Sequence, residues 1–247
     1  MTLSVVTTIY RSEKYLNEFI ELTLAAVNNL SIDSYELIFV LDGITDNSKK
    51  VLLEQKVSVA QINIIELSRN FGHHYAASAG LSNATGEYIF IIDCDLEVSP
   101  TILVDFMKKM KGSDADVVYG VQKSWKGKFI EKQLGGLFWK VFNMLIDNKV
   151  PNNVVTERLM NRNYLEALNS LGDKNIFFAG PMYLVGFNQI GVEVEKSQRK
   201  GKSTYGVLKR VSLLVEAITS FSEKPLKLIF KFGLAITATN YIVFKID

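Results

Sequence analysis

The first 120 residues alternate between short apolar runs, rich in β-branched residues, and longer stretches of helical character. The apolar runs lack polar alternation, which is typical of strands buried on both faces of a sheet. The predicted strands are Leu3–Ile9, Tyr35–Leu41, Ile62–Leu67, Tyr88–Asp93 and Asp116–Val121. The predicted helices between them are Glu13–Asn29, Asp46–Glu54, His73–Ala84 and Pro100–Lys111. This order predicts an α/β fold with a mostly parallel sheet and helices on both faces, which binds ligands beyond the carboxyl ends of its strands.

The alternation ends after residue 121. The later predicted elements are helices at Phe129–Ile146, Asn161–Leu171 and about Val207–Phe221, and one or two strands in Ile176–Asn188. Leu226–Phe244 is almost wholly apolar and approaches the length of a membrane span, provided that Lys231 snorkels. The pattern predicts an α/β half at 1–122, a second half of the same domain at 123–205, and a helical segment at 206–247.

Composition places the chain among globular proteins, with 48% hydrophobic and 22% charged residues in 247. A single cysteine, Cys94, excludes an internal disulfide and fits a reducing compartment. The segment Met1–Ile9 lacks the basic start of a signal peptide and is predicted as a strand. We therefore expect a cytoplasmic location.

The net charge of +2 hides a basic segment between Lys196 and Lys231. Nine basic residues oppose only Glu216 and Glu223 there, which gives a local charge of +7. Such a segment favours an anionic partner, namely a diphosphate, nucleic acid or a lipid surface. A solvated basic helix face explains the same pattern.

The acidic motif Asp93-Cys94-Asp95-Leu96-Glu97 follows the apolar run YIFII. In an extended segment alternate side chains share a face, so its three carboxylates are expected to converge. Their mutual repulsion is relieved by a hard divalent cation, Mg²⁺ or Mn²⁺, which can also bridge to a diphosphate. The alternative is an acid-rich turn at the end of a strand.

Polar residues also follow the other strands. Asp42 and Gly43 come after the second strand, and Arg69 comes after the third. Asp42 could accept hydrogen bonds from a uracil or ribose, and Arg69 could bind nucleotide or phosphate. Taken singly, Asp42-Gly43 is also explained as a plain turn and Arg69 as a surface ion pair.

Several enzyme classes lack their motifs in this chain. The sequence contains no G-x-G-x-x-G after the first strand, no P-loop and no G-x-S-x-G nucleophile elbow. The two histidines, His73 and His74, are adjacent and point about 100° apart on a helix, which argues against a joint metal site. One of them could border the nucleotide site, and a capping or packing role is the alternative.

The chain resembles glycosyltransferase family 2, in particular the branch of polyprenyl-phosphate sugar transferases that includes dolichol-phosphate mannose synthase. The segments that carry the resemblance are SVVTTIY, FVLDGITD, LSRNFGHHYAASAGL, ATGEYIFIIDCDLEVSP, RKGKSTY and AITSFSEKPLKL. The resemblance implies a GT-A fold and an inverting, single-displacement transfer from a nucleotide diphosphate sugar. It makes 1–122 the nucleotide-sugar half, 123–205 the acceptor half and 206–247 a membrane-proximal segment.

The resemblance also assigns residues to the donor site. Thr8 and Tyr10 would border the nucleotide, together with Arg69, and Asp42 would contact the base. Asp93 would lie at the ribose or in the metal environment. Asp95 and Glu97 match the metal-binding pair of the family.

Further assignments concern catalysis and the acceptor. Arg158 matches the arginine of the family's F-R-L segment and joins Asp93 and Asp95 as a catalytic residue. The flexible acceptor loop of the family corresponds to a basic loop here, which contains Arg199, Lys202 and Ser203.

The chain departs from the family pattern at several positions. TTIYRSE stands where the branch has a proline and Y-N-E-E. Thr156 replaces an acid before the F-R-L segment, and Glu157 takes the aromatic position. Arg199 stands two residues before Gly201 instead of three. Two of these three departures lie in the second half, at 123–205.

The leading hypothesis is a metal-dependent transferase that uses a polyprenyl phosphate at the cytoplasmic face of a membrane. The two alternatives are a transferase acting on a hydroxyl of a surface polysaccharide or glycolipid, and a non-catalytic nucleotide-sugar-binding partner. The expected partners are the donor, the acceptor and an anionic membrane surface, and nucleic acid is not among them. The sequence identifies neither the sugar nor the oligomeric state, and UDP is the default nucleotide over GDP or dTDP.

Overall fold

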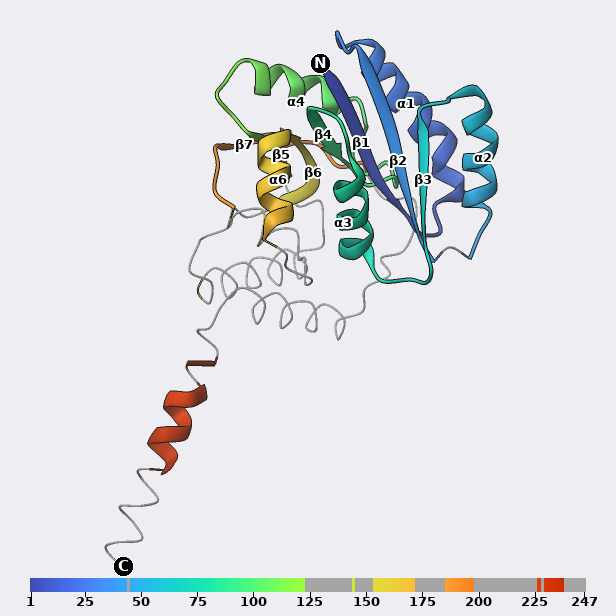
Figure 1. The fold of residues 1–247 in the computed structure, drawn as a ribbon. Helices are drawn as coiled ribbons and strands as arrows, with labels where there is room; N and C mark the ends of the chain where they lie inside the picture. Colours follow the sequence, from blue (N-terminus) through green and yellow to red (C-terminus); the bar gives the residue numbers. More distant parts are fainter. Residues whose placement is uncertain are drawn as a thin grey trace, which may run out of the picture. The chain divides into compact units, whose positions relative to one another are not determined.

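The computed structural model describes residues 1–43, 45–122, 144, 153–171, 185–197, 226–227 and 229–237. The chain divides into two compact units, Met1–Trp125 with Pro151–Lys202 and Lys126–Val150 with Ser203–Asp247. All of the described strands belong to the first unit (Figure 1). The boundaries at 122 and 205 that the sequence suggested stay a prediction.

The first unit begins with alternating strands and helices. These are β1 (Thr2–Ile9), the 3-10 helix η1 (Glu13–Tyr15), α1 (Leu16–Asn28), β2 (Ser34–Asp42), α2 (Ser48–Ser58), β3 (Ile62–Leu67), α3 (His73–Asn83), β4 (Tyr88–Ile91) and α4 (Ile102–Lys111). The elements after α4 are β5 (Val117–Gln122), β6 (Val154–Asn161), α6 (Arg162–Ser170) and β7 (Gln189–Val194).

The strands form one seven-stranded sheet in the order β3-β2-β1-β4-β6-β5-β7. Strand β1 is parallel to β2 and β4, β2 is parallel to β3, and β5 is parallel to β7. Strand β6 is antiparallel to both of its neighbours, β4 and β5. The amino end of β6 therefore lies at the same edge of the sheet as the carboxyl ends of the other strands.

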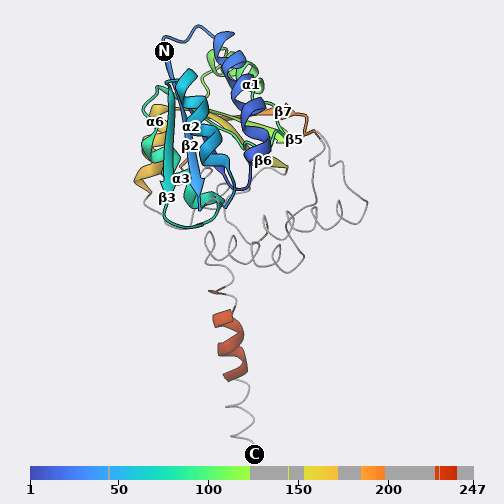
Figure 2. The same ribbon diagram turned by 90° about the vertical axis from the view of Figure 1, so that its right-hand side faces the viewer.

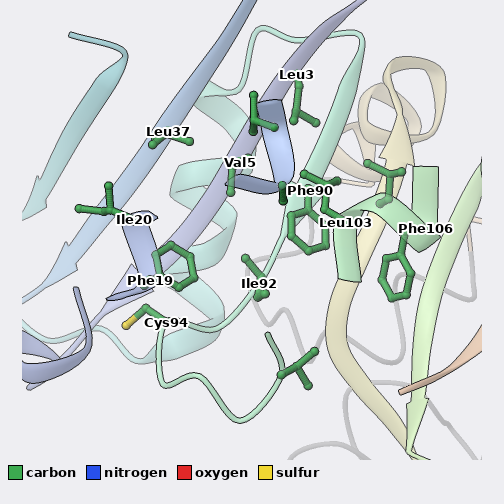
Figure 3. Close-up of a cluster of buried hydrophobic side chains, with 14 of the residues drawn as sticks. Leu3, Val5, Phe19, Ile20, Leu37, Phe90, Ile92, Cys94, Leu103 and Phe106 are labelled. Atoms are coloured by element: carbon green, nitrogen blue, oxygen red, sulfur yellow. The ribbon is translucent and has the colours of Figure 1, made fainter. Parts of the chain in front are cut away.

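Helices cover both faces of the sheet, so each face has its own core. Residues of α1, α2 and α4 pack on one face, and residues of α3 and α6 pack on the other (Figures 1 and 2). The first core contains two edge-to-face ring pairs, Phe19 with Phe39 and Phe90 with Phe106, each with a centroid separation of 6.1 Å. Figure 3 shows Phe19, Phe90 and Phe106 in this core. Burial on both faces explains why these strands carry uninterrupted apolar runs.

The strands and helices predicted for the first 120 residues are all present. The predicted helix Glu13–Asn29 opens with the short turn η1 before α1, and the helix predicted at Asp46–Glu54 lies at Ser48–Ser58. Strand β4 ends at Ile91, two residues before its predicted end. This last difference changes the geometry of the acidic motif.

The second half of the sheet was predicted less well. Helix α6 confirms the prediction at Asn161–Leu171, but β6 and β7 were not predicted as strands. Within the predicted strand region Ile176–Asn188, the described residues 185–188 are not strand. The helices predicted at Phe129–Ile146 and Val207–Phe221 lie outside the described residues, apart from the helical Met144.

Part of the apolar segment near the carboxyl end is helical. Residues 226–227 and 229–237 are described as helix, and their apolar side chains are exposed, with Leu226 at 70% and Phe230 at 66%. Within the described portion of the chain, no helix combines the length and apolar character that crossing a bilayer requires.

Candidate active site

Thr8 near the end of β1 forms a pair with the first residue of α3. The Thr8 hydroxyl lies 2.9 Å from Nδ1 of His73, and Nε2 of the same ring lies 3.6 Å from Oδ1 of Asp93. His73 thus connects the end of β1 with the segment after β4. Tyr10, just beyond β1, is 46% exposed at this edge. The histidine that the sequence suggested as a border of the nucleotide site lies beside two of the predicted site residues.

Asp42, at the end of β2, holds the loop between β3 and α3. Its side chain is buried, and its two carboxylate oxygens accept hydrogen bonds from the backbone N–H groups of Phe71 (2.7 Å) and Gly72 (3.0 Å). Gly43 has a φ of +60°, and a Cβ there would lie 2.2 Å from the backbone nitrogen of Asn70. The close approach of Gly43 to the backbone of Asn70 therefore requires glycine. A contact of Asp42 with a base stays a prediction.

Arg69 lies on the loop that Asp42 fixes. Its guanidinium stacks over the ring of Phe71, with 4.3 Å between the guanidinium carbon and the ring centroid. Among the described residues this side chain makes a cation–π contact, and no ion pair is seen there. Its contact with a nucleotide or phosphate stays a prediction.

The acidic motif after β4 is a turn and not an extended segment, so the expectation of an alternating arrangement was wrong. Strand pairing stops at Ile91, and Leu96 has a φ of +60°. The Asp95 carboxylate accepts a hydrogen bond from the backbone N–H of Glu97 at 3.0 Å, which closes the turn. The turn, rather than strand alternation, places the acidic side chains at this edge.

Two residues from the second half of the sheet reach the acidic turn. Lys196, two residues beyond β7, donates from its ammonium to Oε2 of Glu97 at 3.1 Å. The backbone N–H of Ser197 donates to the Glu97 carbonyl oxygen at 2.8 Å. Burial alone would lower the pKa of Lys196, but the carboxylates of Glu157 and Glu97 outweigh it and raise this pKa.

Glu157, in the first half of β6, is the most buried acid at the site. Its side chain is 1% exposed, and its Oε2 has no hydrogen-bond partner among the described residues. Burial and the nearby Asp93 carboxylate raise the pKa of Glu157 to about 8, although Lys196 opposes the shift. Sequence reasoning did not assign Glu157 to the donor site and counted Lys196 only in the basic segment.

Arg158 follows Glu157 on β6 and is buried inside the sheet. It is 1% exposed, pairs in register with Ile91 of β4, and lies with its guanidinium carbon 5.7 Å from the centroid of the Tyr119 ring. The strand places Arg158 and Glu157 on opposite faces, since adjacent residues of a strand alternate. A catalytic role of Arg158 stays a prediction.

The residues of the acidic turn are compatible with a hard divalent cation. Asp95 and Glu97 supply carboxylate oxygens within three residues, and Mg²⁺ is usually bound by one or two carboxylates together with substrate phosphates and water. In the part of the chain that the structure describes, no group of three or more His, Cys, Asp or Glu side chains is arranged to hold a metal. A metal here would therefore depend on donor phosphates for further ligands.

Two other features of the chain concern catalysis, the buried cysteine and the predicted acceptor loop. Cys94 is buried in the core, and burial raises the pKa of its thiol to about 12, which excludes a thiolate nucleophile near neutral pH. The predicted acceptor-loop residues Arg199, Lys202 and Ser203 lie outside the described residues, so their placement stays a prediction.

Sequence comparisons identify relatives across almost the whole chain. The sequence model described as "Glycosyl transferase family 2" matches residues 4–168. A protein of Mycobacterium tuberculosis named as a glycosyltransferase is 37% identical over 98% of this chain and 72% of its own length. The "Prophage bactoprenol glucosyl transferase homolog" of Escherichia coli K12 is 28% identical over 98% of this chain and 79% of its own length.

Solved structures with low sequence identity share the fold. Glucosyl-3-phosphoglycerate synthase from M. tuberculosis, solved with Mn²⁺, UDP-glucose and phosphoglyceric acid, has a TM-score of 0.55 at 15% identity, with 89% of this chain and 78% of that chain covered. Staphylococcus aureus TarS 1-349 with UDP-GlcNAc has a TM-score of 0.59 at 16% identity, with 88% of this chain covered. The chain spans 65% of that TarS chain, and 58% in another structure of the same fragment.

The seven-stranded mixed sheet and these structural neighbours give the GT-A fold, as expected. The family match covers more than half of the chain, and the relatives align over nearly all of it. The chain therefore belongs to glycosyltransferase family 2 and is a glycosyltransferase.

Proposed function

We propose that this glycosyltransferase moves a sugar from a nucleotide diphosphate donor to a polyprenyl phosphate, in an inverting and metal-dependent reaction at the cytoplasmic membrane face. The observation that carries the proposal is the acidic turn Asp93–Glu97 at the carboxyl edge of the sheet. The Thr8–His73 pair borders it at Asp93, and Lys196 borders it at Glu97. This combination of carboxylates and polar groups suits a diphosphate bound through a cation.

The donor would lie along the edge formed by β1 to β4. Asp95 and Glu97 would hold Mg²⁺ or Mn²⁺, which when bound supplies a Lewis acid that stabilises negative charge on the departing diphosphate. Thr8, Tyr10 and Arg69 would line the nucleotide. Support comes from the structurally similar glucosyl-3-phosphoglycerate synthase, whose solved structure contains Mn²⁺ and UDP-glucose. UDP is the first nucleotide to test.

The acceptor argument rests on which group could remove a proton. A hydroxyl acceptor needs a general base, whereas a phosphate monoester, with a second pKa of about 6, is mostly ionised at neutral pH. Thr156 stands in the acidic position of the family, and the neighbouring Glu157 is 1% exposed. A carboxyl group so deeply buried is poorly placed to receive a proton from an acceptor, which favours a phosphate nucleophile. The similarity to the bactoprenol glucosyl transferase homolog supports the same acceptor class.

The helical residues 226–227 and 229–237 support contact with a membrane surface. Its apolar side chains include Leu226, Ile229 and Phe230, each about two-thirds exposed (70%, 68% and 66%). The basic segment Lys196–Lys231 carries a local charge of +7, and each basic residue near an anionic surface contributes about 1 kcal/mol. Apolar burial and this attraction together would hold the chain at the interface.

The transfer reaction is tested with labelled UDP-sugars, undecaprenyl phosphate and Mn²⁺. We expect a labelled product that extracts into organic solvent, is labile to mild acid and does not form with EDTA. A product that stays with a water-soluble glycan would support the hydroxyl-acceptor alternative and contradict the lipid acceptor. Absence of both transfer and Mn²⁺-dependent donor hydrolysis with UDP-, GDP- and dTDP-sugars would contradict the proposed reaction.

Membrane contact is tested by sedimentation with vesicles of phosphatidylglycerol and phosphatidylcholine. We expect the chain to co-sediment at low salt, and to do so less at high salt or after removal of residues 226–247. A folded chain that stays in the supernatant at low salt contradicts this part of the proposal and leaves the donor chemistry untouched.

A further inference from the structure

Lys196 is attached to the acidic turn through Glu97. Its ammonium donates to Oε2 of Glu97 at 3.1 Å, and the side chains of Lys196 and Glu97 are 27% and 20% exposed. The adjoining backbone N–H of Ser197 donates to the Glu97 carbonyl oxygen at 2.8 Å. Glu97 therefore binds both the side chain and the main chain of the segment that follows β7.

The surroundings of Lys196 are strongly anionic. The carboxylates of Glu157, Glu97 and Asp93 all act on its ammonium, and Asp95 belongs to the same turn. Glu157 is 1% exposed, and its Oε2 has no hydrogen-bond partner in the described part of the chain. Carboxylates gathered in a partly buried site repel one another unless a cation neutralises them. Lys196 supplies that positive charge within the protein itself.

A divalent cation at Asp95 and Glu97 would compete with this ammonium. The Glu97 carboxylate already accepts from Lys196, and a second cation on it would experience charge repulsion at short range. Lys196 has another carboxylate to interact with, because Glu157 also raises its pKa. The ammonium can therefore leave Glu97 without losing every anionic partner.

We propose that Lys196 is the resident counter-cation of the acidic turn, and that it leaves Glu97 when a divalent metal ion binds there. The proposal rests on the metal assignment of the proposed function. Lys196 is then a positioning residue, which acts on the metal site through Glu97. Its charge preserves the turn without metal and weakens metal binding until donor phosphates add their own negative charge.

The test measures Mn²⁺ affinity without nucleotide, from the loss of the free Mn²⁺ signal in electron paramagnetic resonance. Lys196→Met removes the charge and should bind Mn²⁺ about tenfold more tightly than wild type, since a competing cation is gone. Lys196→Arg keeps the charge and should stay near wild type. The matched control Lys109→Met changes an exposed lysine at the end of α4 and should leave the affinity unchanged.

If Lys196 had only a structural role, Lys196→Met would bind Mn²⁺ more weakly than wild type, because loss of a structural contact would loosen the turn. Unchanged or weaker Mn²⁺ affinity in Lys196→Met overturns the inference. If Lys196→Met does not fold, as judged by circular dichroism, Lys196→Gln replaces it, since Gln keeps a donor for Glu97 without the charge. The same increase in affinity is then required.

Asp95→Asn separates this inference from the proposed function. Wild-type Mn²⁺ binding that is lost in Asp95→Asn and unchanged in Lys196→Met overturns the role of Lys196 alone. Wild-type protein that binds no Mn²⁺, with or without UDP, overturns the metal assignment and the inference together. Sugar transfer that persists in EDTA would then show that the proposed transfer reaction takes place without a metal ion.

Discussion

The two halves of the sheet contribute to the same edge in different ways. The half with β1 to β4 places its polar groups at the ends of parallel strands and on the loops that follow, where they form hydrogen bonds with one another. Thr8 lies beside His73, and Asp42 accepts from the loop before α3. The half with β5 to β7 instead buries charge within the sheet, at Glu157 and at its neighbour Arg158.

This difference predicts how substitutions should act in each half of the sheet. In the first half, local strand–turn–helix geometry forms the site, and a single polar change removes a defined set of hydrogen bonds. In the second half, the charges are held by the surrounding strands and by one another. The effect of a substitution there on stability therefore depends on which groups are protonated and paired. Three substitutions test this contrast, from the largest expected effect to the smallest.

Asp95→Asn should have the largest effect, on activity. We expect at least about a 100-fold loss of transfer, equal to about 2.7 kcal/mol, because metal stabilisation of the leaving diphosphate is lost. The metal-dependent part of nucleotide binding should disappear in calorimetric titration, while the thermal unfolding midpoint stays near wild type. Asp105→Asn on the exposed side of α4 is the control. Unchanged Mn²⁺-dependent binding of the nucleotide to Asp95→Asn would remove Asp95 from the metal site.

Asp42→Asn should have an intermediate effect, on stability. One carboxylate oxygen becomes an amide N–H₂, which cannot accept from Phe71 or Gly72, so a part-buried backbone N–H loses its acceptor. We expect a loss of about 1–3 kcal/mol in the free energy of unfolding, measured by urea denaturation. Asp114→Asn, at an exposed position before β5, should change little. Equal stability of the two variants would mean that the loop before α3 does not depend on Asp42.

Glu157→Gln should have the smallest effect, and only above the ordinary pKa of a glutamate, 4.5. The folded-state pKa of Glu157, about 8, lies above its ordinary value of 4.5, so folding favours the protonated carboxyl. This contribution to stability is fully present below pH 4.5 and is lost as pH rises through 8. Glutamine imitates the protonated form, so the variant should unfold about 2–4 °C higher than wild type at pH 9, for a gain of about 1 kcal/mol.

The pH dependence of the Glu157→Gln variant sharpens the comparison of the two halves. Its melting temperature should vary less than that of wild type between pH 6 and pH 9, and the two proteins should converge near pH 5. Glu36→Gln is a suitable control, because hydrogen bonds from Ser4 and Thr85 outweigh burial and lower the pKa of Glu36, so it stays ionised throughout this range. Parallel curves for wild type and Glu157→Gln would show that Glu157 is ionised in the folded protein.

The sequence alone determined the half of the sheet that contains β1 to β4. Uninterrupted apolar runs at regular intervals predicted β1 to β5, and polar residues at the ends of those runs predicted Asp42, Arg69 and the acidic motif Asp93–Glu97 at one edge. These conclusions depend only on local order, because parallel strands joined by helices must bring their carboxyl ends together. The family motifs in the same segments pointed to the same edge and to glycosyltransferase family 2.

Only the tertiary structure decided which distant residues complete the site. The reversed direction of β6 places Glu157 beside the carboxyl end of β4, and the parallel pairing of β5 and β7 brings Lys196 to Glu97, 99 residues away in the chain. The polar residues Thr156 to Arg158 interrupt the apolar pattern of β6, so periodicity could not reveal a buried strand there. Burial of those charges follows from the strands on either side, and strand pairing is a property of the folded chain that no local pattern encodes.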